Sequence, residues 1–144
     1  MEKLLISSCL LGNNVKYNGK NNYIFGIEKL KEKYDLIVIC PEVMGGISIP
    51  RIPSEIKGNK VINKELKDVT LEFEKGAKKV LDLAKKYNIK YALLKDGSPS
   101  CASSYIYDGS FNSIKIEGLG ITAFKLKENN IKIYNEFNWK ELLK

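Results

Sequence analysis

The chain has 144 residues, 44% of them hydrophobic, which is enough to fill the core of one domain and too few for two. It contains three cysteines and no histidine, which excludes Ser–His and Cys–His nucleophile pairs and every zinc site that uses histidine. The net charge of +7 fits either attraction to nucleotides or RNA, or a lysine-rich solvated surface. The second interpretation is favoured, because no lysine run is interleaved with aromatic residues.

Apolar patterns predict an alternation of strands and helices. In chain order these are a strand at Leu4–Ser8, a helix at Asn22–Tyr34, a strand at Leu36–Ile39, a helix at Thr70–Tyr87, a strand at Tyr91–Leu94, a helix at Gly120–Asn129, a strand at Ile131–Tyr134 and a short helix at Trp139–Leu143. Two long loops are expected, at Cys40–Lys67 and Asp96–Gly118. We therefore expect a compact single α/β domain over residues 1–144, with a mostly parallel sheet, helices on both faces and a Rossmann-like arrangement in the loose sense.

No segment has the length of a membrane-spanning helix, and the first residues lack the pattern of a signal peptide. An odd number of cysteines also argues against a framework of disulfides. We therefore expect a cytoplasmic protein that does not associate with a membrane.

Each cysteine follows a predicted strand. Cys9 comes directly after the first strand, Cys40 ends the second, and Cys101 lies in the loop that leaves the third. Because the carboxyl ends of parallel strands meet at one edge of a sheet, the fold should bring the three thiols together. The alternative is that each is a small buried hydrophobic residue. It is less favoured, since all three lie beside Gly, Pro or Ser and none lies within a strand or helix core.

Three thiolates without a fourth thiolate or imidazole favour a particular inorganic chemistry. A structural zinc ion has four protein ligands, and a catalytic one usually has histidine among its three. A [4Fe-4S] cluster normally has four cysteine ligands, so three would leave one iron with an open position. That iron is a Lewis acid, and sulfur is a ligand that it would bind well. The prediction depends on the number and placement of the cysteines, since the chain has no CxxC motif.

Carboxylates lie near one of the cysteines. Glu42 is two residues from Cys40 and is a candidate proton donor and acceptor, although a surface glutamate that caps a backbone amide is an equally good interpretation. Glu55, in the same loop, is a weaker candidate.

Hydroxyl groups, rings and glycines accompany the third cysteine. Ser98 and Ser100 precede Cys101 and are candidates for binding substrate or activating water, with ordinary turn hydrogen bonding as the alternative. Tyr107–Phe111 either supplies rings that stack on a base or is a hairpin loop packed by its own rings. Gly118–Gly120 precedes a predicted helix whose amides could bind an anion.

Taken together, these segments resemble the thiouracil desulfidase (TudS) family, earlier known as domain of unknown function 523. The resemblance covers nearly the whole chain and is carried by Ile6–Gly12, Cys40–Gly46, Pro50–Pro53, Ser98–Cys101, Tyr107–Phe111 and Gly118–Ala123. It implies a compact α/β domain that holds a [4Fe-4S] cluster through Cys9, Cys40 and Cys101. The family's catalytic carboxylate and hydroxyl would correspond to Glu42 and Ser98, with Ser100 as the alternative hydroxyl.

The activity that the resemblance implies is removal of sulfur from a thiolated pyrimidine of the 2-thiouracil or 4-thiouridine type. The sulfur would bind the open iron, and the products would be the oxo-base and hydrogen sulfide. The substrate is expected to be a base or nucleoside, with tRNA as a further possibility, and the protein a monomer or weak dimer. Two alternatives stay open: other non-redox cluster chemistry, such as a hydro-lyase or sulfur transfer in tRNA thiolation, and a metal- or RNA-binding module without catalysis.

Overall fold

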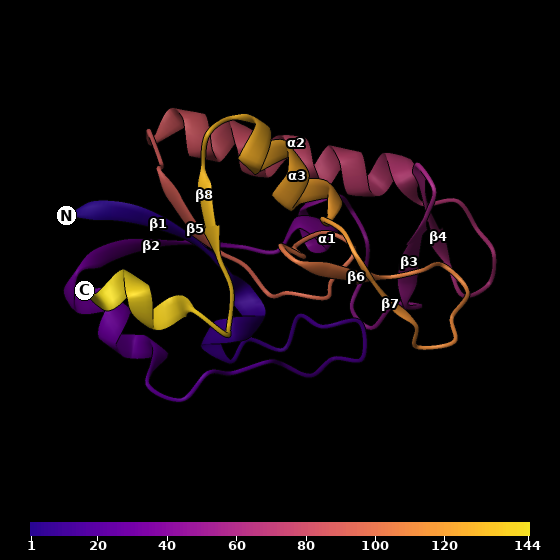
Figure 1. Cartoon of the computed structure of the whole chain (residues 1–144), viewed down its shortest axis with the longest axis horizontal. Helices are drawn as coiled ribbons and strands as arrows, with labels where there is room; N and C mark the ends of the chain where they lie inside the picture. The colour runs from indigo at the N-terminus through magenta and orange to yellow at the C-terminus, as the bar shows by residue number, and fades with distance from the viewer.

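Four short strands form a parallel sheet that lies between two layers of helices, in the half of the molecule that contains both termini (Figure 1). The structure is a computed structural model that describes all residues from 1 to 144. The strands are β1 (Glu2–Ser7), β2 (Tyr34–Ile39), β5 (Tyr91–Leu93) and β8 (Lys132–Tyr134), in the order β2-β1-β5-β8. Every neighbouring pair is parallel. The predicted α/β class and parallel sheet are confirmed.

Helices cover both faces of the sheet, and the alternating side chains of the strands divide the core accordingly. Leu5 and Ala92 pack under α2 (Thr70–Lys86) and α3 (Ile121–Glu128). The intervening residues of the strands face the other side, which is covered by three 3-10 helices: η1 (Ser8–Leu11), η2 (Ile27–Glu32) and η3 (Trp139–Leu143). In Figure 1, α2 and α3 lie above the sheet and the terminal 3-10 helix lies below it.

The crossovers place a crevice between β1 and β5. The connection from β1 to β2 runs through η1 and η2 on one face, while those from β2 to β5 and from β5 to β8 run through α2 and α3 on the other. The first connection leads to one side of β1 and the later ones lead to its other side, so the order in which strands are added reverses between β1 and β5. Right-handed crossovers that run in opposite directions across a sheet lie on opposite faces. Such a switch point leaves an open crevice at the carboxyl ends of the strands.

The two long loops predicted from the sequence contain short regular elements. The first holds α1 (Pro41–Met44) and an antiparallel hairpin of β3 (Ser54–Lys57) and β4 (Lys60–Asn63). The second holds an antiparallel hairpin of β6 (Tyr105–Tyr107) and β7 (Lys115–Glu117). A small apolar core of Ile56, Val61, Phe73, Ala102 and Ile106 lies beneath the hairpins. Figure 1 shows both hairpins at the end of the molecule opposite the N-terminus.

The predicted helix at Asn22–Tyr34 is wrong. Only residues 27–32 are helical, as the 3-10 helix η2, and Tyr34 already begins β2. Gly26 has a φ of 87°, a left-handed conformation that an α-helix does not continue through. The amides of Asn22 and Ile24 instead bond to the carbonyls of the turn after β1.

Two further expectations concern larger features of the architecture. The Rossmann-like detail is not confirmed, since the sheet has four strands. None of the helices combines the length and the apolar character that crossing a membrane requires.

Candidate active site

The three cysteines line a single cavity of about 430 Å³ at the carboxyl ends of the strands. Cys9 lies in η1 immediately after β1, and Cys40 directly precedes α1 after β2. Cys101 lies in the loop that follows β5. The cavity is also lined by Glu42, Ser98 and Ser100. The structure thus brings together around one cavity the three predicted ligand residues and the three predicted catalytic residues.

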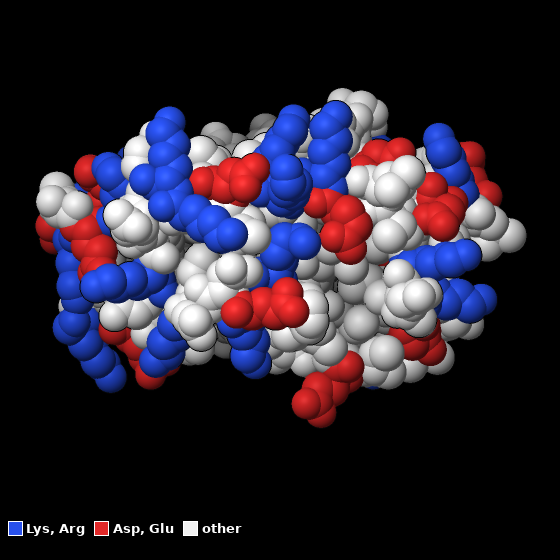
Figure 2. All heavy atoms as spheres, turned by 90° about the horizontal axis from the view of Figure 1, so that it is seen from above, with Lys and Arg blue, Asp and Glu red and all other residues white.

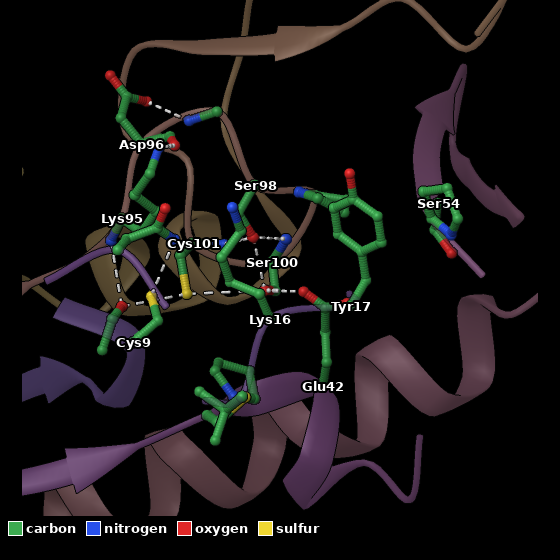
Figure 3. Close-up of a pocket in the computed structure, with 18 of the residues that line it drawn as sticks. Cys9, Lys16, Tyr17, Glu42, Ser54, Lys95, Asp96, Ser98, Ser100 and Cys101 are labelled. Atoms are coloured by element: carbon green, nitrogen blue, oxygen red, sulfur yellow. Dashed lines mark hydrogen bonds between the residues drawn. The ribbon is translucent and has the colours of Figure 1, made fainter. Parts of the chain in front are cut away.

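Side-chain hydrogen-bond donors approach two of the three sulfur atoms. The side-chain amide of Asn22 donates to Cys9 Sγ over 3.4 Å. The hydroxyls of Ser7 and Ser100 lie 3.5 Å and 3.6 Å from Cys101 Sγ. In Figure 3, the sulfur atoms of Cys9 and Cys101 lie side by side. These contacts are suited to thiolate sulfur, which accepts hydrogen bonds more strongly than a thiol does.

Burial shifts the pKa of all three thiols upward. It raises the pKa of Cys9 and Cys40, and that of Cys101 to about 12. Repulsion between Cys9 and each of the other two thiolates adds to the effect. All three are free thiols. Such a set stays protonated at neutral pH unless a positive centre is bound among the sulfur atoms.

The cavity does not contain a site for a single metal ion. No three side chains of Cys, Asp or Glu lie close enough together to share one ion. A cluster differs in this respect, because each of its cysteine ligands binds a different iron atom and the sulfur atoms stay further apart.

A carboxylate and two hydroxyls form a connected chain beside Cys101. Ser100 Oγ donates to Glu42 Oε2 over 3.1 Å, and Ser98 Oγ lies 2.9 Å from Ser100 Oγ (Figure 3). Arg51 Nε donates to the other carboxylate oxygen, Glu42 Oε1, over 3.0 Å. The interpretation of Glu42 as a surface residue is therefore wrong, since its side chain is 16% exposed and bonded on both oxygens. This series of hydrogen-bonded side chains can pass a proton between the carboxylate and a group in the cavity.

Asp96 organises the loop that carries the serines and Cys101. Its side chain is fully buried, and Oδ1 accepts hydrogen bonds from the amides of Gly97, Ser103 and Ser104. Burial by itself would raise the pKa of this carboxyl, but bonds from Ser104 and these amides outweigh it and lower the pKa. The sequence analysis did not single out Asp96, although the Asp-Gly pair was a signal for a tight turn.

A partly buried ion pair lies beside Cys9. Lys95 Nζ is 2.7 Å from Glu136 Oε2 and also donates to the carbonyl of Asp96. Its positive charge lowers the pKa of Cys9, in opposition to the larger effect of burial. Nothing in the sequence indicates that Lys95 and Glu136 pair, since 41 residues separate them and only the parallel pairing of β5 with β8 brings them together.

Glycines allow the elements that carry the site to pack closely. A Cβ on Gly76 of α2 would lie 1.9 Å from the Pro41 carbonyl oxygen, and one on Gly45 would lie 2.0 Å from that of Glu72. A Cβ on Gly120 would lie 2.4 Å from the Ser100 carbonyl carbon. A side chain at any of these three positions would collide with backbone atoms. Only glycine therefore allows α1 and the cysteine loop to lie this close to the helices beside them.

Two other sequence-based expectations receive a structural explanation. Glu55 Oε1 accepts bonds from the amides of Gly109 and Phe111, so it anchors the β6–β7 hairpin from the cavity wall. The amides at the start of α3 do not bind an anion, because residues 120–123 donate to carbonyls of residues 99–102. The carbonyls of the cysteine loop thus accept the hydrogen bonds that the sequence suggested for a bound anion.

The basic charge is not gathered into a nucleic-acid groove on the face formed by α2 and α3. Figure 2 shows lysine and acidic side chains interspersed there, and Lys125 of α3 pairs with Glu74 of α2 over 3.8 Å. This pattern is that of a solvated helix surface.

Nearly the whole chain is similar to known proteins. A protein-family model described as 2-thiouracil desulfurase matches residues 4–138. The uncharacterized protein YbbK of Bacillus subtilis (strain 168) is 37% identical over 150 residues, covering 97% of this chain and 99% of that protein. A solved structure described as [4Fe-4S]-dependent thiouracil desulfidase TudS is 39% identical, with a TM-score of 0.95. The match covers 99% of this chain and 96% of that one.

Proposed function

Because the chain belongs to the 2-thiouracil desulfurase family, we propose that it is a [4Fe-4S]-dependent enzyme that removes sulfur from a thiolated pyrimidine. The observation that carries the proposal is the meeting of Cys9, Cys40 and Cys101 with Glu42 and Ser100 around one cavity. One buried and two partly buried thiols beside a bonded carboxylate–hydroxyl pair make a site for a thiophilic cofactor next to a proton-transfer group.

The donor set fits a cluster held by three cysteines. The three thiols come from three strand ends, line the same cavity and have no fourth thiol or imidazole among them. Hydrogen bonds from Asn22 and Ser7 reach two of the sulfurs, as is usual for cluster ligands. When bound, such a cluster has one iron without a protein ligand, which supplies a Lewis acid for the sulfur of the substrate.

The chain's own residues provide the proton chemistry. Hydrolysis of a thiocarbonyl consumes one water and yields the oxo-base and hydrogen sulfide. We assign Glu42 as the group that takes a proton from the attacking water and returns it to the departing sulfur. Ser100 Oγ, 3.1 Å from Glu42 Oε2, and Ser98 Oγ, 2.9 Å further along, position the water. Since Oε1 is held by Arg51, proton exchange takes place at Oε2.

The finer points of the proposal concern substrate, assembly and location. We propose that 2-thiouracil or 4-thiouridine types of base or nucleoside are substrates, and that residues 1–144 act as a single desulfidase-like domain, as a monomer or weak dimer. The α2–α3 face does not support tRNA binding, because acidic side chains are interspersed among its lysines (Figure 2). A cytoplasmic location is proposed because three reduced thiols are needed to hold the cofactor.

The test is anaerobic purification, followed by measurement of iron, acid-labile sulfide and release of sulfide from 2-thiouracil and 4-thiouridine. We expect the wild type and Glu42→Gln to hold equal iron, and Glu42→Gln to lose about 10²- to 10⁴-fold in kcat, as expected for loss of general acid–base catalysis. Cys101→Ala should lose both cluster and activity. Zinc without inorganic sulfide in the wild type, or full activity in Cys101→Ala, would refute the proposal.

A further inference from the structure

The only arginine of the chain is buried in the wall of the cavity. The side chain of Arg51 is 6% exposed, and the guanidinium uses three separate donors. Nε donates to Glu42 Oε1 over 3.0 Å, Nη2 to the carbonyl of Val15 over 2.9 Å, and Nη1 to the carbonyl of Ser48 over 3.4 Å. One planar group therefore joins a carboxylate of the site to two main-chain segments.

The main chain of Arg51 reinforces one of these connections. Its amide donates to the carbonyl of Tyr17 over 2.7 Å, so side chain and main chain together hold the Val15–Tyr17 segment. This segment lines the cavity and belongs to no strand or helix. Its other backbone bonds within residues 13–20 are local, such as those between Lys16 and Lys20. Asn13, just before the segment, bonds to Ser8, but the hydrogen bonds that connect residues 15–17 to a distant part of the chain come from Arg51.

We propose that Arg51 is a positioning residue that sets the Glu42 carboxylate and the Val15–Tyr17 wall of the cavity in a fixed relation to each other. The inference rests on the proposed function for the role of Glu42, but the hold on the Val15–Tyr17 segment stands independently of it. Through Arg51, the group that handles the proton and the wall that faces the substrate are placed as one unit.

The chemistry of the guanidinium explains why lysine cannot do the same, although the chain contains many lysines. An ammonium is a single point charge, whereas the guanidinium has donors that point in fixed directions within a plane. Those directions match an acceptor on Glu42 and another on Val15 at the same time. Arg51→Lys keeps a positive charge beside Glu42 but loses the second connection.

The experiment compares Arg51→Lys and Arg51→Met with Ser48→Ala in anaerobically purified, cluster-containing protein. Ser48→Ala is the matched control, because Arg51 uses only the main-chain carbonyl of Ser48 and the side chain is exposed. Hydrogen exchange of peptides covering residues 13–20 reports on the cavity wall, and kcat and KM for 2-thiouracil report on the site.

We expect exchange in residues 13–20 to become at least about tenfold faster in both Arg51 variants, through loss of the bond to Val15. In Arg51→Met, kcat should fall by about 10- to 100-fold as Glu42 loses its orientation, and KM should rise as the wall loosens. In Arg51→Lys, kcat should lie between that of Arg51→Met and that of the control. Iron content should stay at the control value in both.

Different outcomes separate the two halves of the inference from the proposed function. Exchange at the control rate in Arg51→Lys overturns the hold on the cavity wall, and this variant serves even where Arg51→Met fails to fold. A control-level kcat in either Arg51 variant overturns the positioning of Glu42. If the wild type releases no sulfide from any thiolated pyrimidine, the proposed function fails, while the exchange result still decides whether Arg51 holds the wall.

Discussion

The contact between α1 and α2 allows a sharp test of how the site is positioned. Gly76 lies in the middle of α2 and faces the start of α1. A Cβ at this position would lie 1.9 Å from the carbonyl oxygen of Pro41, 2.8 Å from its carbonyl carbon and 3.2 Å from the amide nitrogen of Gly45. These are backbone atoms, so Gly76→Ala must move α1 by a distance on the order of 1 Å in a closely packed interior. Cys40 and Glu42 move with it.

The expected effect on stability is small, because two contributions oppose each other. Overpacking costs about 1–3 kcal/mol. Replacing glycine by alanine within a helix recovers about 1 kcal/mol of helix propensity. The net loss is then roughly 0–2 kcal/mol, which lowers Tm by at most about 8 °C. The activity should respond far more, since a misplacement of about 1 Å in a catalytic group can lower the rate about 100-fold.

The measurement combines thermal unfolding, iron content and sulfide release for Gly76→Ala. Lys79→Ala is the control, because it places alanine at an exposed position of the same helix. We expect Gly76→Ala to stay folded at 25 °C while its activity falls about 100-fold relative to the control. If its activity and iron content equal those of Lys79→Ala, the close approach of α1 and α2 does not position the site and the reasoning is wrong.

Two further predictions concern buried ionisable groups. Asp96→Asn should lower the free energy of unfolding by about 1.5–3 kcal/mol at pH 7, since the charged acceptor of the cysteine loop is lost. The folded-state pKa of Asp96 is lowered from 3.8, so the stability that its charge contributes is fully present above pH 3.8. That stability is lost as the pH falls through the folded-state pKa. The free energies of unfolding of wild type and Asp96→Asn, measured with urea from pH 7 to pH 3, should therefore converge at the acid end. In cluster-free protein, Cys101, with its pKa raised to about 12, should react with iodoacetamide at pH 8 more slowly than Cys9 and Cys40. Equal labelling of all three by mass spectrometry would contradict this.

The sequence predicted the elements in which apolar side chains recur at a regular spacing. The helix at Thr70–Tyr87 matches α2 to within one residue, because its apolar stripe has a clear helical period. The four strands of the parallel sheet were also found, as short apolar runs. The helix at Asn22–Tyr34 was wrong, since apolar spacing alone does not register the left-handed backbone at Gly26. The strands β3, β4, β6 and β7 were missed because they lie within segments whose Gly, Pro and Ser content is typical of loops.

For the site, the residues adjacent to strand ends could be predicted, and the contacts between them could not. Parallel strands send their carboxyl ends to one edge, which was sufficient to gather Cys9, Cys40 and Cys101 around one cavity. The pairing of Glu42 with Arg51 and Ser100 was not predictable, because it depends on how α1 and two loops pack.

The sequence by itself therefore determined the chemical inventory, the sheet and the edge at which the thiols meet, because these follow from composition and from periodicities within single elements. Only the tertiary structure decided which groups bond to each oxygen of Glu42, and that Arg51 joins Glu42 to the Val15–Tyr17 segment. Those properties arise from directional bonds and close backbone contacts between segments far apart in the chain, for which a local pattern carries no signal.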